Sequence, residues 1–388
     1  MKKFLVIFSI LLLLISLFTV TFAFTEHASV FKIGKRSLDS TLAKNTPASV
    51  PLPIAGNLQQ NVCDTALSMA KGGSCSFQTT AKACVVMERN SRRILFEKNA
   101  NEHLPMASTT KIVTALTVIN HANLDDVVTI PQKACGIEGS SVYLRVGEKL
   151  TVKQLLYGLM LRSGNDCAVA LALHVGGSVE KFAQMMNQTA NQLGCRDSNF
   201  VNPHGLHNDN HFTSARDLAT ITCAALKEEQ FAQIVGTKSI KIAKDDCQRV
   251  LTNKNKLLST FPDSDGVKTG YTKKAGRCFV GSATRNGMQV VVVVLNCGPM
   301  FEETAQLLDV AFANFTNVCI IPKNKLCGTI YVKGKSAYYY AEKDFSYPVA
   351  SNEHLSRQIT LTENCQKVDV LLNGQIVKSI PLVAMRSD

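Results

Sequence analysis

The sequence predicts an α+β arrangement followed by a small all-β domain. Between residues 120 and 248, apolar residues recur mostly at helical spacing. From about residue 266 the pattern changes to strands, which a final amphipathic helix follows. Beyond residue 316, short alternating segments are separated by turns, which is typical of an all-β module.

The first predicted elements form a hairpin and a helix. Residues 83–87 and 94–97 flank Arg89-Asn90-Ser91-Arg92, a sequence that predicts a turn. A loop then leads into an apolar stretch, residues 112–119, whose apolar positions recur at helical spacing. Further helices are predicted at residues 152–161, 166–175, 179–193 and 215–226.

The later elements are mostly strands. Strands are predicted at residues 266–271, 277–283 and 288–296, and Arg285-Asn286-Gly287 is a strong hairpin turn. The valine run near residue 292 predicts a strand buried on both faces. A helix at residues 302–315 closes this unit, and the last strands are predicted at residues 329–333, 337–341, 358–361 and 368–372.

The N-terminal segment predicts export. Lys2 and Lys3 precede a long apolar run, and small residues near Ala23 suit cleavage of a signal peptide, although the run is nearly long enough to remain as an anchor. We therefore assign residues 1–23 to a signal peptide and residues 24–78, polar and proline-containing, to a linker. No amphipathic helix follows the last predicted strand, so a C-terminal membrane anchor is not expected.

Charge and cysteine content restrict the partners. The formal net charge is +12, which favours association with anionic polymers or membrane surfaces but equally fits a solvated basic surface. No basic patch interleaved with aromatic residues predicts nucleic-acid binding. The 13 cysteines contain no Cys-x-x-Cys pair, so buried, reduced thiols are the expectation and no metal or other cofactor is predicted.

Three short motifs carry the chemistry. In Ser108-Thr109-Thr110-Lys111, residues three apart share a helix face, which places a hydroxyl beside an amine. Taken alone, Ser108 would suit a helix N-cap and Ser163-Gly164-Asn165 a helix C-cap. With Lys268-Thr269-Gly270 as a third motif, in this order, chance is a poor explanation.

These motifs and their surroundings resemble the low-molecular-weight penicillin-binding proteins that are serine D-alanyl-D-alanine carboxypeptidases. Similar stretches are residues 105–115, 139–175, 202–218 and 265–272. The resemblance implies a transpeptidase-like fold, in which an antiparallel sheet is flanked by helices and completed by a helical insert. Residues 79–316 would form this catalytic domain, and residues 317–388 resemble the family's all-β domain more loosely.

The resemblance also implies site residues and partners. Ser108 would be the acylated nucleophile, Lys111 its base and Ser163 a second catalytic hydroxyl, with Asn165 and Lys268 binding substrate. The implied substrate is a peptidoglycan stem peptide ending in D-Ala-D-Ala, and β-lactam antibiotics would be covalent inhibitors.

Elementary chemistry fits these roles. A lysine acts as a base only when neutral, so the pKa of Lys111 must be lowered by burial or by a nearby charge such as that of Lys268. Gly270 permits close backbone approach, and the Tyr271 N–H is a second donor for an oxyanion beside the Ser108 N–H. Lys268 and Thr269 can bind a terminal carboxylate.

Three alternatives stay open at the level of sequence. A β-lactamase on the same scaffold is disfavoured because the middle motif is Ser-Gly-Asn and no deacylating glutamate can be assigned. A catalytically silent wall-binding module is disfavoured by the intact motifs. His204, His207 and His211 with Asp209 have a spacing compatible with zinc, but they fall in an irregular loop.

Overall fold

A computed structural model describes residues 77–244, 247–332, 335–362 and 364–386. The predicted signal peptide and the linker as far as residue 76 lie outside the described residues. Residues 77–80 already pack on the folded unit, since Phe77 stacks on Phe96 and the Thr80 backbone N–H donates to Glu303. Among the described residues, no helix combines the length and the apolar character needed to cross a membrane.

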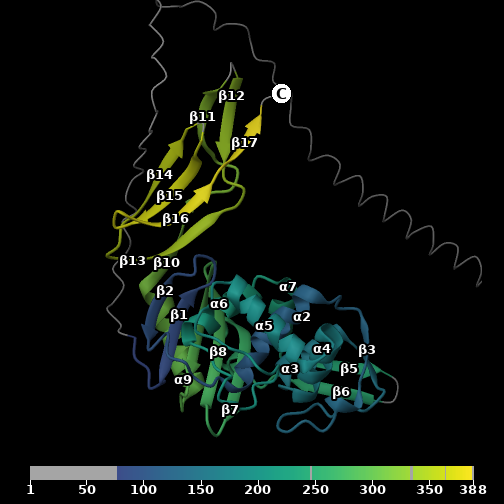
Figure 1. The fold of residues 1–388 in the computed structure, drawn as a ribbon. Helices are drawn as coiled ribbons and strands as arrows, with labels where there is room; N and C mark the ends of the chain where they lie inside the picture. The colour runs from purple at the N-terminus through teal and green to yellow at the C-terminus, as the bar shows by residue number, and fades with distance from the viewer. Residues whose placement is uncertain (1–76, 245–246, 333–334, 363, 387–388) are drawn as a thin grey trace, which may run out of the picture. The chain divides into compact units, whose positions relative to one another are not determined.

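A five-stranded antiparallel sheet organises the first part of the chain, in the order β2-β1-β9-β8-β7 (Figure 1). Its strands are β1 Ala83–Glu88, β2 Ile94–Lys98, β7 Ser264–Thr272, β8 Gly276–Arg285 and β9 Met288–Leu295. The predicted hairpins are confirmed, and Asn286 and Gly287 have the positive φ angles, 51° and 74°, that a tight hairpin turn requires.

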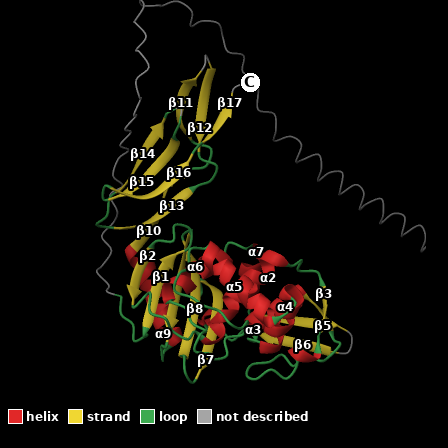
Figure 2. Cartoon of the chain, in the orientation of Figure 1, coloured by secondary structure: helices red, strands yellow, loops and turns green. Residues whose placement is uncertain are grey.

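Helices cover both faces of this sheet (Figure 2). α9 Met300–Asn314 packs on β8 and β9, while α6 Ala215–Ala225 packs on β1 and β9 from the other side. All side chains of β9 from Val290 to Leu295 are fully buried, which confirms the strand predicted to be buried on both faces. The sheet is therefore a central layer between two helical layers.

The helical region surrounds the helix that follows Ser108. A 3₁₀ turn, Ala107–Thr110, leads into α2 Lys111–His121, which contacts α3, α4, α5, α6 and α7. These helices are α3 Val152–Leu161, α4 Asn165–Gly176, α5 Val179–Gln192, α6 and α7 Glu229–Gly236. The four helices predicted here after residue 150 are confirmed within one residue at each end.

Residues 120–248 are less helical than expected. β3 Val127–Thr129 pairs with β4 Lys149–Thr151, and β5 Ser239–Lys244 pairs with β6 Cys247–Thr252. A short 3₁₀ segment spans Gln132–Ala134, and a short helix, α8 Leu257–Thr260, lies just beyond this region. Periodicity missed the strands because each has at most six residues, too few to separate an alternating from a helical pattern.

The C-terminal residues form strands only. β10 Phe315–Ile321 pairs with β13 Phe345–Ala350, and two three-stranded sheets have the orders β11-β12-β17 and β14-β15-β16. Their bounds are β11 Leu326–Val332, β12 Lys335–Tyr340, β14 Leu355–Leu361, β15 Gln366–Leu372, β16 Gln375–Pro381 and β17 Val383–Arg386. The all-β prediction is confirmed, although β10, β13, β16 and β17 were not predicted; the domain boundary at residues 316 and 317 stays a prediction.

Ten cysteines in the described part of the chain are free thiols. Six are buried: Cys84, Cys167, Cys195, Cys223, Cys278 and Cys297. Burial raises the pKa of Cys223 to about 12, so this thiol stays protonated at neutral pH. Cys319 is exposed, against the expectation that such thiols are buried.

Candidate active site

Ser108 lies in the 3₁₀ turn that precedes α2, not in the first turn of the α-helix as the sequence predicted. The hydroxyls of Thr109 and Thr110 donate to the backbone carbonyls of Met106 and Ala107, at 2.7 and 2.8 Å. Ser108 does not cap the helix, since its hydroxyl points to Lys111. The two threonine hydroxyls thus stabilise the backbone of the turn, while the Ser108 hydroxyl contacts the Lys111 amine.

Lys111 is completely buried and lies beside Ser108. Its Nζ is 2.9 Å from Ser108 Oγ, 2.7 Å from Asn165 Oδ1 and 2.6 Å from the His204 carbonyl oxygen. Desolvation, followed by the charges of Lys268 and Lys254, holds the pKa of Lys111 well below its usual range. A neutral amine that donates to the two acceptors Asn165 Oδ1 and His204 O directs its lone pair to the Ser108 hydroxyl. The group is therefore arranged as a base for that hydroxyl.

Asn165 connects the middle motif to this centre. Its side-chain oxygen accepts from Lys111, its Nδ2 donates to the Glu138 carbonyl oxygen and its backbone N–H donates to the Ser140 carbonyl oxygen at 2.7 Å. Ser163, two residues earlier, is buried and has a φ of 63°. A positive φ is uncommon for serine and costs free energy, which is typical of a residue held for function.

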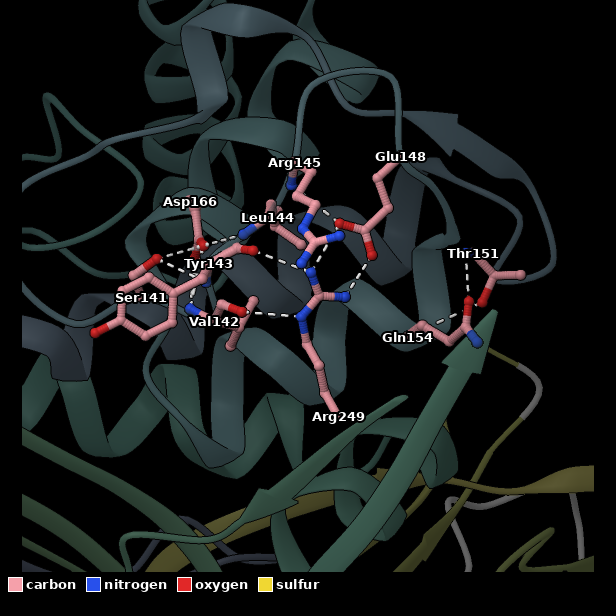
Figure 3. Close-up of polar contacts among 10 residues, drawn as sticks. All are labelled: Ser141, Val142, Tyr143, Leu144, Arg145, Glu148, Thr151, Gln154, Asp166 and Arg249. Carbon is pink, nitrogen blue, oxygen red and sulfur yellow. Dashed lines mark hydrogen bonds and ion pairs between the residues drawn. The ribbon is translucent and has the colours of Figure 1, made fainter. Parts of the chain in front are cut away.

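Asp166 fastens the loop that runs beside the middle motif (Figure 3). Its carboxylate accepts hydrogen bonds from the Ser141 hydroxyl at 2.6 Å and from the backbone N–H groups of Val142 and Leu144 at 3.1 Å. Because Asp166 follows Asn165 in the first turn of α4, these bonds fix the loop beside the residue that contacts Lys111. This role of Asp166 was not predicted, although an acidic residue in the first turn of a predicted helix is a visible signal in the sequence.

Arg249 of β6 holds the same loop from the other side (Figure 3). Its guanidinium donates to the carbonyl oxygens of Val142 and Tyr143, each at 3.0 Å, and pairs with both oxygens of Glu148. This ion pair is largely shielded from solvent, with about 15% and 11% of the two side chains exposed. The β5–β6 hairpin, which was not predicted, thus positions the loop of Val142 and Tyr143 beside the site.

The third motif lies on β7, next to the turn of Ser108. A Cβ added to Gly270 would lie 3.0 Å from Met106 O and from Ser108 N, and 3.1 Å from Thr109 N. All three atoms belong to the backbone, so only glycine lets the strand approach this closely. This contact brings Thr269 and Tyr271, which flank Gly270, to the nucleophile; the Tyr271 side chain is 66% exposed.

Lys268 is buried in β7 and donates to the Thr269 carbonyl oxygen at 3.0 Å. Desolvation, followed by the charge of Lys254, lowers the pKa of Lys268 to about 7. Lys268 is therefore a buried cation and not an ordinary exposed strand lysine. A protonated Lys268 lowers the pKa of Lys111 in turn, which is the coupling that the sequence predicted.

Lys254 is a cation of the site that sequence reasoning missed. Its backbone N–H donates to the Leu161 carbonyl oxygen at 3.1 Å, at the end of α3, and its Nζ donates to Ser140 Oγ at 2.9 Å. Its charge lowers the pKa of both buried lysines, Lys111 and Lys268. Its sequence setting, Asn253-Lys254-Asn255 after a short strand, has no period that would mark it.

The loop after α5 packs against the turn that holds Ser108. Gly205, with a φ of 89°, lies so close that a Cβ there would be 2.0 Å from Ala107 O. His211 Nδ1 accepts from the Val201 N–H, so its Nε2 carries the proton that is shared with Thr110 Oγ1 at 2.8 Å. Burial lowers the pKa of His211 to about 3, and the ring stays neutral.

The histidine loop does not form the zinc site that its spacing allowed. Both ring nitrogens of His211 have protein partners, and His204 Nδ1 accepts from the Leu206 N–H at 3.2 Å. In the part of the chain that the structure describes, no group of three or more histidine, cysteine, aspartate or glutamate residues is arranged to hold a metal ion. The His211 ring instead bonds the loop to Thr110 at the start of α2, and the His204 ring bonds within the loop.

The fold and the site define a class of enzyme. A serine with a buried lysine base, an asparagine bound to that lysine, and a Lys-Thr-Gly strand packed on the serine turn are the parts of an active-site-serine acyl transferase of the penicillin-binding type.

Comparison with known proteins identifies the family. Residues 69–298 match the family model of D-alanyl-D-alanine carboxypeptidases, peptidase family S11, and the chain belongs to this family. It is 34% identical to D-alanyl-D-alanine carboxypeptidase DacF of Bacillus subtilis over 279 residues, 70% of this chain and 72% of the relative. It is 32% identical to DacC of Escherichia coli over 340 residues, 79% of this chain and 84% of the relative.

Solved structures agree with the fold. Penicillin-binding protein 5 of Haemophilus influenzae superposes with a TM-score of 0.70 at 29% identity, covering 81% of this chain and 99% of that structure. The Streptomyces K15 DD-transpeptidase superposes with a TM-score of 0.59 at 33% identity, covering 61% of this chain and 98% of that structure. The predicted transpeptidase-like α+β fold is thereby confirmed.

Proposed function

We propose that this D-alanyl-D-alanine carboxypeptidase removes the terminal D-alanine from peptidoglycan stem peptides through an acyl-enzyme on Ser108. The observation that carries the proposal is the position of the buried Lys111 amine, 2.9 Å from Ser108 Oγ. A lysine held neutral by burial can take the hydroxyl proton at physiological pH, which an exposed lysine cannot do.

Acylation follows from this arrangement. Lys111 takes the proton of Ser108 as Oγ attacks the carbonyl carbon of the penultimate D-alanine. The backbone N–H groups of Ser108 and Tyr271 stabilise the oxyanion that forms, because Gly270 brings the two segments together. The bond between that carbon and the nitrogen of the terminal D-alanine then breaks. The proton passes to the departing nitrogen through the Ser163 hydroxyl.

Substrate recognition is assigned to the remaining motif residues. Lys268 and Thr269 bind the free carboxylate of the terminal D-alanine; binding an anion raises the pKa of Lys268 from its value of about 7 and keeps the ammonium protonated. The Asn165 amide holds a peptide group of the substrate while it orients Lys111. Release of the acyl group requires water, and β-lactams, which leave no diffusible amine, acylate Ser108 and stay bound.

Location and partners follow from the substrate. Peptidoglycan lies outside the cytoplasmic membrane, so the enzyme acts there, in agreement with the export signal predicted in residues 1–23. The positive net charge favours association with the anionic membrane surface. The all-β strands from β10 onward serve as a spacer or docking module, since the described catalytic groups all lie before residue 272.

The test is intact mass spectrometry after incubation with penicillin, combined with an assay of D-alanine release from a peptide ending in D-Ala-D-Ala. Wild type and Ser259→Ala, a control at an exposed serine, should carry one penicilloyl adduct and release D-alanine. Ser108→Ala should do neither. Rapid loss of penicillin without an adduct would favour a β-lactamase, and intact penicillin without an adduct would favour a silent wall-binding module.

A further inference from the structure

The three-stranded sheet β11-β12-β17 presents large apolar side chains to solvent (Figure 1). The exposed fractions are 49% for Leu326, 72% for Tyr331, 37% for Tyr338 and 39% for Val383. Ten large apolar side chains are exposed in the described part of the chain, so this one small sheet holds four of them. Apolar side chains that gather on one surface are typical of an interaction site.

The register of the strands places these side chains on one face of the sheet. Residues directly opposite each other in an antiparallel pair point to the same side, and so do alternate residues along a strand. Tyr331 lies two residues beyond the partner of Tyr338. Tyr340, two residues beyond Tyr338, pairs with Leu326 of one neighbouring strand and with Val383 of the other. We call the surface of these five residues the tyrosine face.

The opposite face of the sheet packs on the rest of the β domain. A Cβ added to Gly328 would lie 2.3 Å from Leu361 Cδ1 of β14, so β11 and β14 are in close contact there. Tyr339, between two residues of the tyrosine face, packs against the apolar cluster of the β domain. The tyrosine face therefore points away from this cluster, and among the described residues it is open to solvent.

Basic residues are concentrated in the same part of the chain. Residues 322–344 and 383–386, which contain the three strands of this sheet, have six basic and two acidic side chains in the sequence. Residues 345–382 have three of each. Lys325 and Lys343 are exposed at one end of the sheet, directly before β11 and shortly after β12. The excess of positive charge in the β domain thus lies in the segments that carry the tyrosine face.

An apolar face beside basic residues is complementary to the surface of an anionic membrane. Tyrosine rings are favoured at the boundary between headgroups and acyl chains, and lysines are attracted to anionic headgroups. Leu326 and Val383 gain free energy when they leave water for the acyl region, whereas an anionic wall polymer would offer them mainly polar groups. The aliphatic side chains of the face therefore favour a membrane over a polymer as its partner.

We propose that the tyrosine face is a membrane-docking surface, which inserts its apolar side chains between anionic lipids while Lys325 and Lys343 contact the lipid phosphates. The inference rests on the proposed location of the enzyme outside the cytoplasmic membrane, and it assigns the proposed membrane association to one sheet. None of the proposed catalytic groups belongs to this sheet, so docking uses no group that the reaction needs.

A single fluorescent reporter tests whether the face meets lipid. The chain without its predicted signal peptide, residues 24–388, contains no tryptophan, so Tyr331→Trp supplies one reporter on the tyrosine face. Its emission should shift to shorter wavelength with vesicles of phosphatidylcholine that contain about 30% phosphatidylglycerol. The shift should be smaller with phosphatidylcholine alone and at about 0.5 M salt. The matched control, Ile376→Trp, places the reporter at a 57% exposed position of β16, and its emission should not shift.

Co-sedimentation with the same vesicles measures the affinity. The double variant Tyr331→Ser/Tyr338→Ser should bind about tenfold less tightly, because two interfacial rings are lost. Lys325→Gln should bind about fivefold less tightly, the factor equivalent to about 1 kcal/mol for one lysine at an anionic surface. The controls Ile376→Ser and Lys378→Gln remove an exposed apolar and an exposed basic side chain of β16, and both should bind within about twofold of wild type.

Four results would overturn the inference. They are the absence of vesicle binding by wild type, equal binding by the double tyrosine variant, Tyr331→Trp emission that is already at short wavelength without vesicles, and a shift caused by purified peptidoglycan instead of lipid. The third result would mean that another part of the chain or a second copy covers the face, and the fourth would assign it to a wall polymer. Penicillin acylation of the same proteins is measured separately and should equal that of wild type; its absence in wild type would overturn the proposed function instead.

Discussion

Gly270 tests how closely the Lys-Thr-Gly strand must approach the nucleophile. Gly270→Ala adds a methyl group 3.0 Å from Ser108 N and Met106 O, closer than ordinary carbon contacts, and both atoms are backbone atoms that cannot rotate away. The strand must therefore move by a few tenths of an ångström. Since a misplacement of about 1 Å costs roughly 100-fold in rate, we expect acylation to fall about tenfold, or about 1.4 kcal/mol in activation free energy.

The assay is the second-order rate constant for acylation by a fluorescent penicillin. Overpacking should also lower the free energy of unfolding by about 1–3 kcal/mol, measured by urea denaturation. The matched control is Gly298→Ala, where an added Cβ meets no atom within 4 Å and the backbone φ is not positive; it should acylate at the wild-type rate. A Gly270→Ala enzyme that acylates as fast as wild type would refute the close-approach argument.

Three further predictions concern the buried charges. Lys111→Ala should slow acylation roughly 10²–10⁴-fold, measured with the same penicillin, because the base is lost; a small effect would mean that another group takes the proton. The second prediction concerns Lys268, whose pKa is about 7 in the folded chain and about 10.4 in the unfolded chain. Between these two pH values the unfolded state binds more protons than the folded state. The contribution of Lys268 to the free energy of unfolding should therefore rise with pH by up to about 1.4 kcal/mol per pH unit across that window. Lys111 adds a rise of the same sign, so the Lys268→Met curve should rise less steeply than wild type across that window and lie at least as high at pH 7; parallel curves would contradict the assigned pKa. The third prediction is that Asp166→Asn lowers the free energy of unfolding by about 2 kcal/mol, because an amide cannot accept all the hydrogen bonds that the loop donates to the carboxylate. Thermal melting measures the effect, and the exposed control Asp125→Asn should melt at the wild-type temperature.

The catalytic motifs were predictable because each is local. Ser108 and Lys111 are three residues apart, so any helical turn brings them together regardless of the rest of the fold. Gly270 was predicted to allow close backbone approach, and the structure supplies the atoms that make this necessary. The hydrogen bond between Lys111 and Asn165 joins two motifs 54 residues apart, and it was not predicted, because the resemblance assigned Asn165 to substrate binding alone.

Several supporting residues could not be predicted from local pattern. Lys254 acts through the charges it places near two lysines that are distant in sequence, and nothing in its own neighbourhood signals this. Arg249 lies on a short hairpin that periodicity assigned to a helical region. The spacing of the histidines was compatible with zinc. Spacing alone does not show whether a ring nitrogen already has a hydrogen-bond partner in the protein, and both ring nitrogens of His211 have one.

The sequence by itself determined the family, the order of the main helices and strands, and the candidates for the reacting groups, because these depend on periodicities and motifs within a few residues. The tertiary structure decided how the groups act. Burial lowers the pKa of Lys111 and that of Lys268, the latter to about 7, and burial is set by the packing of helices and β7 around them.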